Sequence, residues 1–402
     1  MKNIVYIAPF PMATTMKFAL AIGALPHARL LGIFQAAPAA ALRASFAEVI
    51  VVKNALDVDR LEKAVRIFMV KYGKIDKILG ILEQLQEPLA LLRVRLGVAG
   101  MTPKQSHLFR DKAAMKSALR KAGIPCARYR KIQSVHDAWA FIDEVGFPIV
   151  LKPPTGAGCR ATYRISNPGE LVSALQEIPV RPVLAEEFLT GAEYSMETFT
   201  LHGVPRFYSF SRYYPSPLEV MQNSHIQWVV LFPHELEKEL FQQAKDVGYA
   251  AIKALGLDTG MTHMEWFRRP DGSVAIGEIG ARPPGAQFSD AIGLIHGVDI
   301  FHVWARLMVD EHFDRPLRRQ SAAALAFLRG RGHGKIVAIQ GLAEAQKKMG
   351  KLVVASKLPQ VGVMRSSGYE GDGWVLIQHP DTEVVKRAAL ELITTVQIRY
   401  QY

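Results

Sequence analysis

Short apolar runs alternate with amphipathic stretches through the first hundred residues. The apolar runs predict strands at residues 4–7, 30–34, 49–52 and 77–81. Between them, residues 16–24 have a helical pattern, and Asp57 is an N-cap residue for another helix that continues to about Tyr72. Because strands alternate with helices, residues 1–100 are expected to form an open α/β domain with a parallel sheet.

From residue 101 the pattern changes to strand pairs separated by capped helices. The predicted helices begin at Thr102 or cover residues 111–122, 134–145, 166–177, 235–255 and 300–308. The predicted strands are at residues 149–151, 161–165, 194–201, 204–211, 261–268 and 273–279, and another begins at 183. Residues 213–233 are expected to be rich in loops. The change of pattern places a second domain at residues 101–315.

The last part of the chain is expected to be a smaller α/β domain, at residues 316–402. Its strands are predicted at residues 322–328, 335–339, 352–355, 374–378 and 398–400. One helix is predicted at residues 381–395. The expected fold class is therefore α/β and α+β, with an open parallel sheet at the N-terminus.

Residues 147–165, FPIVLKPPTGAGCRATYRI, place a lysine before a glycine-containing loop. An apolar strand leads into Lys152, and Gly156 and Gly158 follow. Glycines let successive backbone N–H groups turn toward one point, which makes an anion cradle, and the lysine adds a positive charge. A Walker loop has its lysine after the glycines, and a dinucleotide fingerprint opens a helix, so this is neither. A hairpin with a surface lysine is the alternative, and this stretch alone leaves both interpretations open.

A predicted hairpin with the turn sequence Arg-Pro-Asp-Gly at residues 269–272 carries two glutamates. If Asp271 and Gly272 are the central turn residues, Glu265 and Glu278 lie opposite each other on one face, with Cβ atoms about 5 Å apart. Two such carboxylates repel unless a cation joins them, and Mg²⁺ commonly binds one or two carboxylates together with phosphate oxygens. A register slip would make both surface residues, but their apolar neighbours favour the metal site.

Other charged residues lie near these stretches. Arg282 follows in the loop at residues 280–285, where it could neutralise phosphoryl or acyl-phosphate charge or form a salt bridge with a glutamate. Glu83 and Glu87 follow a predicted strand, at the edge where ligands collect in open sheets. Helix capping is the interpretation that we favour for these two.

The composition is that of a globular protein with two or three domains, since the 402 residues are 49% hydrophobic and 21% charged. The formal net charge of +12 suits a polyanionic partner such as a nucleotide, a nucleic acid or a membrane surface. Basic residues are densest at residues 315–351 but lack the aromatic interleaving of nucleic-acid motifs, so a solvated basic face is expected there.

The cysteines and the N-terminal segment bear on localisation. Cys126 and Cys159 have no metal-type spacing and fit a reducing compartment. The apolar residues 18–41 are interrupted by prolines, His27 and Arg29, so they do not read as a membrane span. We therefore expect a cytoplasmic protein with neither a membrane nor a nucleic acid as partner.

Together, these motifs resemble the ATP-grasp superfamily, and within it the carboxylate–amine ligases, including L-amino-acid ligases. The matching segments are residues 110–112, 122–125, 146–153 and 186–195, and Glu265 with residues 278–283. Each motif is weak alone, but their order and spacing are specific. The resemblance implies an ATP-grasp core of two subdomains at residues 101–315, followed by a lid-like C-terminal domain.

The resemblance also implies roles for matching residues. Lys112 and Lys152 would grip the ATP phosphates. A flexible loop would close over them through Thr155, Gly156 and Gly158. The adenine hinge and the ribose contact would be Glu186, Glu187, Leu189 and Glu193. The magnesium carboxylates would be Glu265 and Glu278, with Mn²⁺ as an alternative ion, and Arg282 would hold the carboxylate or acyl phosphate. Many members have an asparagine where this chain has Gly280, so the number of metal ions is left open.

The implied reaction begins when a substrate carboxylate attacks the γ-phosphate of ATP, giving an acyl phosphate and ADP. An amine then displaces phosphate and forms an amide or dipeptide, without a protein nucleophile. His225 is a candidate substrate-pocket residue, and the resemblance allows a homodimer because many relatives are dimers. Two alternatives stay open. One is an ATP-grasp enzyme with another acceptor, such as a bicarbonate-using carboxylase or a purine-pathway ligase, and the other is a nucleotide-binding regulatory protein without turnover.

Overall fold

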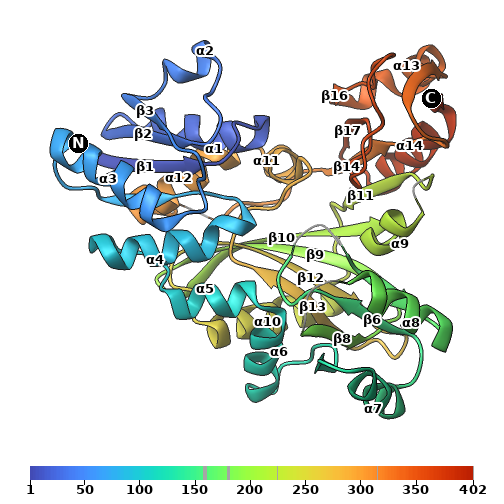
Figure 1. The fold of residues 1–402 in the computed structure, drawn as a ribbon. Helices are drawn as coiled ribbons and strands as arrows, with labels where there is room; N and C mark the ends of the chain where they lie inside the picture. The colour runs from blue at the N-terminus through green and yellow to red at the C-terminus, as the bar shows by residue number, and fades with distance from the viewer. Residues whose placement is uncertain (157–160, 179–181, 224, 315, 402) are drawn as a thin grey trace.

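The computed structural model describes residues 1–156, 161–178, 182–223, 225–314 and 316–401. Figure 1 shows three groups of elements, which are an N-terminal sheet, a small antiparallel sheet, and a large sheet that the middle and C-terminal parts share. The mixture of one parallel sheet with antiparallel sheets confirms the expected fold class.

The N-terminal sheet is parallel and has the strand order β3-β2-β1-β4. Its strands are β1 (Lys2–Ala8), β2 (Ala28–Phe34), β3 (Glu48–Val51) and β4 (Lys77–Leu79). The helical elements are α1 (Ala13–Gly23), α2 (Ala40–Arg43), α3 (Val58–Tyr72), η1 (Glu83–Leu85) and α4 (Gln86–Leu96). Asp57 caps α3 by accepting hydrogen bonds from the backbone of Asp59 and Arg60, as the sequence predicts.

The small sheet is antiparallel, with the order β5-β8-β6-β7. Its strands are β5 (Tyr129–Ile132), β6 (Ile149–Lys152), β7 (Tyr163–Ile165) and β8 (Val183–Glu187). The helices of this part are α5 (Pro103–Arg110), α6 (Lys112–Lys121), α7 (Val135–Val145) and α8 (Pro168–Glu177). Side-chain caps from Thr102, Asp111, Ser134 and Asn167 begin these four helices, so the local start signals place them well.

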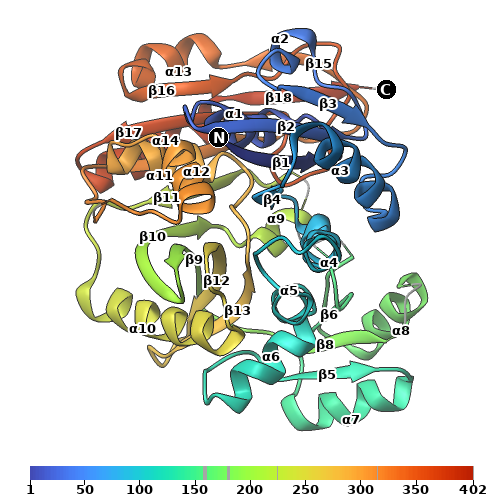
Figure 2. The same cartoon turned by 90° about the vertical axis from the view of Figure 1, so that its left-hand side faces the viewer.

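The large sheet has the order β13-β12-β9-β10-β11-β14-β17-β16. Its first five strands along the chain are β9 (Ala192–Leu201), β10 (Val204–Tyr214), β11 (Trp228–Phe232), β12 (Gly260–Arg268) and β13 (Val274–Gly280). The accompanying helices are α9 (Pro217–Gln222), α10 (Lys238–Leu255), α11 (Phe288–His296) and α12 (Ile300–Asp310). In Figure 2, α10 lies along one side of β9 and β12, while α11 and α12 lie toward the N-terminal sheet.

The C-terminal strands extend the large sheet. Three of them join it through antiparallel pairing, namely β14 (Ala322–Leu328), β16 (Val353–Lys357) and β17 (Gly373–His379). A separate two-stranded sheet contains β15 (Lys335–Gln340) and β18 (Gln397–Gln401). The helical elements are α13 (Leu342–Met349), η2 (Gly350–Leu352) and α14 (Thr382–Thr395). The expected elements are present, but one sheet crosses the boundary expected near residue 315, so the three-domain division stays a prediction.

The expectation of a loop-rich region at residues 213–233 is wrong. Helix α9 and strand β11 lie there, and β11 pairs with both β10 and β14 inside the large sheet. Every residue of β11 is buried. A five-residue strand that is buried on both faces has no alternation of polar and apolar positions, which is why its pattern was not recognised.

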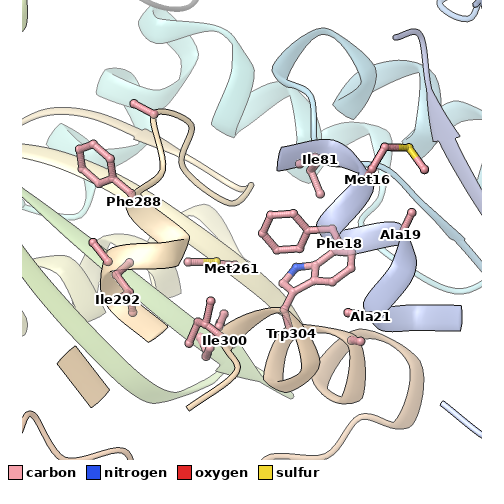
Figure 3. Packing of buried hydrophobic residues seen from close by; sticks show 14 of the residues in the cluster. Met16, Phe18, Ala19, Ala21, Ile81, Met261, Phe288, Ile292, Ile300 and Trp304 are labelled. Carbon is pink, nitrogen blue, oxygen red and sulfur yellow. The ribbon is translucent and has the colours of Figure 1, made fainter. Parts of the chain in front are cut away.

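Helix α1 connects the N-terminal sheet to the large sheet. Figure 3 shows Phe18 of α1 against Trp304 of α12, with Met261 of β12 nearby. The ring centroids of Phe18 and Trp304 are 4.9 Å apart at an interplanar angle of 77°, and Phe301 adds a second edge contact at 4.8 Å. This shared apolar core holds the N-terminal domain over the large sheet.

The surface differs from expectation within the basic segment at residues 315–351. Arg329 is 5% exposed, and Arg319 donates to Ser209 Oγ at 2.8 Å and to the Phe210 carbonyl at 3.1 Å, so these two arginines do not belong to a solvated basic face. Among the described residues, no single helix is long and apolar enough to cross a bilayer; α11 and α12 pass that test only as a pair, bent by 99°.

Candidate active site

One cleft between the small and large sheets brings together most of the predicted residues. The predicted residues that line it are Lys112, Lys152, Gly156, Glu186, Glu187, Leu189, Glu193, Glu265, Glu278 and Arg282. They come from α6, β6, β8, β9, β12, β13 and the loops next to them. Segments that are far apart in the sequence therefore meet around one space.

Two lysines enter this cleft from different elements. Lys112 is the first residue of α6, and its Nζ donates to Glu278 Oε1 at 2.9 Å and to the Gly156 carbonyl at 3.1 Å. Its backbone N–H also donates to the Pro154 carbonyl at 2.9 Å, which ties the glycine-containing loop to the start of α6. Lys152 ends β6, and its Nζ lies 2.9 Å from Glu186 Oε2.

The two glutamates of the β12–β13 hairpin are cross-strand partners, as the register argument predicts. The turn is longer than expected, however. Arg269 and Ser273 close a three-residue loop, in which Gly272 has a φ of +83°. An irregularity between Glu265 and Trp266 then shifts the register by one and places Glu265 opposite Glu278. The correct pairing thus comes from a longer turn together with a bulge at Gly277.

Lys116 donates a hydrogen bond to this bulge, and the sequence analysis did not predict it. It lies one helical turn after Lys112, is fully buried, and donates from Nζ to the Gly277 carbonyl at 2.7 Å. The same Nζ lies 3.4 Å from Glu186 Oε1. Lys116 therefore links β13 of the large sheet to β8 of the small one. The signal in the sequence is a lysine on the apolar face of an amphipathic helix.

Negative charge gathers where β9, β12 and β13 meet. Burial acts to raise the pKa of Glu278, but the charges of Lys112 and Lys152 outweigh it and lower that pKa to about 2. Burial, and then the neighbouring Glu265 carboxylate, raise the pKa of Glu193 well above its usual value. A cation at this point would relieve the repulsion between these carboxylates.

The donor set fits Mg²⁺ or Mn²⁺. Glu265 and Glu278 offer hard oxygen donors on one face of the hairpin, and both side chains remain about 30% exposed to the cleft. Within the described ranges, no three acidic, histidine or cysteine side chains are grouped so as to hold an ion on their own. Two protein carboxylates completed by phosphate oxygens is the coordination that Mg²⁺ commonly takes.

His263 lies beside one of these carboxylates, that of Glu265. Its Nδ1 lies 2.7 Å from Glu197 Oε1, and its Nε2 lies 3.7 Å from Glu265 Oε1. Burial acts to lower the pKa of His263, but hydrogen bonds with the two glutamates outweigh it and raise that pKa to about 9. Glu197 is fully buried and also accepts a hydrogen bond from Ser195 Oγ at 2.7 Å. This buried polar network restricts where Glu265 can point.

The loop after β13 brings Arg282 to the cleft, where it donates from Nε to Glu83 Oε2. Glu83 also accepts from Arg110 at 3.3 Å and is 8% exposed. The expectation that Glu83 caps a helix is therefore wrong, since Leu82 holds the N-cap position of η1. A Cβ added at Gly280 would lie 3.4 Å from Glu83 Oε2, so the Glu83 carboxylate lies beside the position where the resemblance led us to expect an asparagine.

One end of the cleft is apolar and aromatic. Tyr213, Trp228, Phe288 and Tyr369 line it together. The rings of Trp228 and Tyr369 are 5.0 Å apart, and those of Tyr213 and Trp228 are 5.7 Å apart. Tyr369 comes from the C-terminal part of the chain, and Trp228 lies in the unpredicted strand β11. Sequence periodicity gave no sign of this pocket.

Some predicted residues lie elsewhere or are held in other ways. The Glu187 carboxylate accepts hydrogen bonds from the backbone N–H and Nε of Arg128, both at 2.8 Å. Thr155 is exposed and is not among the residues that line the cleft, and Gly158, like Cys159, falls outside the described residues. His225 is also exposed and lines a separate depression, because it precedes β11 at the surface instead of pointing into the sheet.

Comparison with known proteins identifies the domain around this cleft. The family model described as the ATP-grasp domain matches residues 117–286. The chain is similar to the L-arginine-specific L-amino acid ligase of Bacillus subtilis, with 26% identity over 240 residues that cover 57% of each chain. The chain spans just over half the length of the curated relatives it matches.

Two solved structures share the fold over nearly the whole chain. The L-amino acid ligase from Bacillus licheniformis has a TM-score of 0.82 at 20% identity, and the match covers 100% of this chain and 99% of that one. The biotin carboxylase domain of the Hydrogenobacter thermophilus 2-oxoglutarate carboxylase has a TM-score of 0.70 at 17% identity, covering 98% and 90%. The latter was solved with MgADP and bicarbonate.

Proposed function

The chain carries an ATP-grasp domain, and from this premise we propose that it is an ATP-dependent carboxylate–amine ligase. It would activate a carboxylate as an acyl phosphate and couple it to an amine, releasing ADP and phosphate. The single observation that carries this proposal is the pairing of Glu265 with Glu278 opposite Lys112 and Lys152 in one cleft that also contains Arg282. The similarity to L-amino acid ligases supports the choice of acceptor.

In this proposal the two lysines bind the triphosphate. Lys152 directly precedes the loop that contains Gly156, and Lys112 donates to the Gly156 carbonyl; phosphate oxygens would replace Glu186 and Glu278 as partners of these lysines. The hinge at Glu187 and Leu189 would hold the adenine, and Glu193 would contact the ribose. Glu265 and Glu278 would hold the divalent ion, which would neutralise charge on the phosphates as the γ-phosphoryl group moves.

Arg282 would bind the substrate carboxylate and, after phosphoryl transfer, the acyl phosphate. One carboxylate oxygen attacks the γ-phosphorus, and the bond to the β-phosphate oxygen breaks to release ADP. The amine nitrogen then attacks the acyl carbon, phosphate leaves, and the nitrogen loses a proton. Because Arg282 now pairs with Glu83, an incoming carboxylate has to replace Glu83 at the guanidinium.

The apolar end of the cleft supports a substrate with an apolar side chain. Trp228, Phe288 and Tyr369 offer ring surfaces near the loop that carries Arg282. Bicarbonate, the acceptor of the first alternative, has no side chain to cover these rings. That alternative nevertheless keeps the support of the biotin carboxylase neighbour, so the test has to separate the two.

The test is a screen of carboxylate–amine pairs, including pairs of amino acids, for release of ADP and phosphate, followed by mass determination of the product. We expect release of ADP and phosphate that depends on both organic substrates. The mass of the product should equal the sum of the two substrate masses minus one water. Glu278→Gln should lower kcat/KM by about 10²-fold or more, because a charged ligand to the metal is lost. Glu239→Gln, an exposed residue of α10, is the matched control.

Three results would contradict the proposal. Release that depends on bicarbonate alone would favour a carboxylase. Nucleotide binding without release under any substrate pair would favour a regulatory protein. Unchanged turnover in Glu278→Gln would remove the hairpin glutamates from the site.

A further inference from the structure

A second cavity lies on the other side of the loop that carries Arg282. It is bounded by β4 and α4 of the N-terminal domain, the start of β12, and α12. Its volume is about 130 Å³, and the exposed Ala99 and Gly100 are at its edge. Among the described residues, Arg282 is the only one that lines both this cavity and the candidate active site.

Five charged side chains line this cavity, namely Lys77, Arg93, Asp258, Arg282 and Glu311, and the buried one among them is Arg93, which is 7% exposed. Nε and one terminal nitrogen of Arg93 both donate to a single acceptor, the Ile78 carbonyl, at 3.0 and 2.7 Å. Among the described residues, no carboxylate forms an ion pair with it within 4 Å. Of the other charged residues in the lining, Lys77 and Glu311 pair with each other at 2.5 Å, Arg282 pairs with Glu83, and Asp258 is exposed.

A buried cation without a counter-ion is costly, and its structural duties here are small. Burial lowers the pKa of Arg93 to about 10, and no neighbouring acid opposes this shift. Holding one carbonyl needs only a neutral donor. The buried guanidinium therefore indicates that the cavity takes an anion, because an anion supplies the missing charge and the remaining hydrogen-bond acceptors.

The opposite wall of the cavity is apolar. Leu79, Leu257, Met261 and Trp304 contribute to it, and each is at most 4% exposed. Figure 3 shows Met261 and Trp304 side by side where α12 meets the large sheet. An apolar wall together with a small number of polar groups is the usual form of a small-molecule site. The combination excludes a strongly hydrated ion as the best ligand and fits a carboxylate with an apolar tail.

We propose that this cavity is an accessory binding site for a small monocarboxylate whose apolar tail lies against Leu257, Met261 and Trp304 while its carboxylate binds Arg93. The cavity volume of about 130 Å³ limits the ligand to a small molecule, and the five-carbon acid isovalerate is taken as the probe. Since Arg282 borders both cavities, the bound acid would contact the loop that presents Arg282 to the substrate. This site is separate from the proposed ligase chemistry and does not depend on it.

The test is isothermal titration calorimetry of the full chain with isovalerate, in the absence of nucleotide. We expect saturable binding of isovalerate, and at least ten-fold weaker binding of acetate, which lacks the tail, and of 3-methylbutan-1-ol, which lacks the charge. Arg93→Gln should abolish binding, because the amide still reaches the Ile78 carbonyl but carries no charge. Arg95→Gln, two residues along the same helix and half-exposed, is the matched control and should bind as the parent does.

Met308→Trp is a second variant, which fills the cavity and leaves Arg93 in place. If circular dichroism shows that Arg93→Gln does not fold, the affinity of Met308→Trp for isovalerate tests the proposal instead. The proposal is overturned if isovalerate does not bind, or if both variants keep their affinity within twofold. It is also overturned if the alcohol binds as tightly as the acid, or if inorganic phosphate binds more tightly, since phosphate would then identify a simple anion site.

Discussion

At the scale of single residues, each cation of the candidate active site is already paired with a carboxylate from another segment. The three pairs are Lys112–Glu278, Lys152–Glu186 and Arg282–Glu83. Such pairing compensates charges that would be costly to leave alone in a half-buried cleft. An anionic ligand has to replace these carboxylates as partner, so the site is charge-balanced before substrates arrive.

Lys116 gives a residue-scale prediction. Lys116→Met should lower the free energy of unfolding by about 3 kcal/mol, because the Gly277 carbonyl loses its buried donor and the Glu186 carboxylate keeps Lys152 as its cation but loses Lys116. Urea denaturation followed by circular dichroism measures this loss. Lys121→Met, exposed on the same helix, should change the stability by less than about 0.5 kcal/mol.

A double variant separates lost charge pairing from lost packing. Glu186→Gln combined with Lys116→Met should be less destabilised than the sum of the two single variants, because the contact between these two side chains is then lost once and not twice. Strict additivity would mean that the 3.4 Å contact between the Lys116 and Glu186 side chains carries no coupling, and that Lys116 acts through Gly277 alone.

At the scale of elements, the link between β8 and β9 lies directly against the β12–β13 hairpin. Gly191 has a φ of +121°, and a Cβ built on it would lie 2.0 Å from the Arg268 carbonyl oxygen. No side chain fits there without moving the backbone of one element. This glycine thus fixes how the segment that carries Glu193 approaches the strand that carries Glu265.

Gly191→Ala should therefore destabilise the chain by about 3 kcal/mol, from the combined cost of the unfavourable φ and the displaced hairpin. The measurement is again the free energy of unfolding in urea. Gly203→Ala, in the β9–β10 turn, is the matched control, since its φ is +74° but nothing lies within 4 Å of the added Cβ. It should cost only about 1 kcal/mol. Equal losses in the two variants would show that backbone strain alone, and not the contact with Arg268, sets the cost at Gly191.

At the scale of the whole molecule, local signals predicted most elements, whereas contacts between distant segments were predicted only from a register argument or from the resemblance to ATP-grasp enzymes. Asp57, Ser134 and the Glu265–Glu278 pair were found because caps and hairpins act over a few residues. Glu83 was assigned to helix capping, and Lys116 was missed, because their partners lie 199 and 161 residues away along the chain. No periodicity carries information over such separations.

The large sheet shows the same limit. Strand β11 joins β10 to β14 and so continues one sheet from the ATP-grasp domain into the C-terminal part. Its neighbour β14 has the sequence AAALAFL and is buried on both faces. Such a sequence predicts a buried strand but does not indicate which strands it pairs with. Strand order follows from which buried surfaces meet, and the order of eight strands was therefore out of reach of pattern reasoning.

The point where α11 meets this sheet gives a prediction for the pH dependence of stability. Burial, and then the charge of Arg319, lower the pKa of His296 from 6.5 to about 3. The folded chain thus keeps His296 neutral below pH 6.5, whereas the unfolded chain takes up a proton there, so stability is lost as the pH falls. At pH 5 the loss is about 2 kcal/mol. In urea titrations from pH 7.5 to 4.5, the free energy of unfolding of His296→Leu should fall by about 2 kcal/mol less than that of the parent. His302→Leu, on the exposed side of α12, should fall as the parent does. If His296→Leu lost as much stability on acidification as the parent, the imidazole of His296 would be protonated in the folded chain, with its charge compensated there.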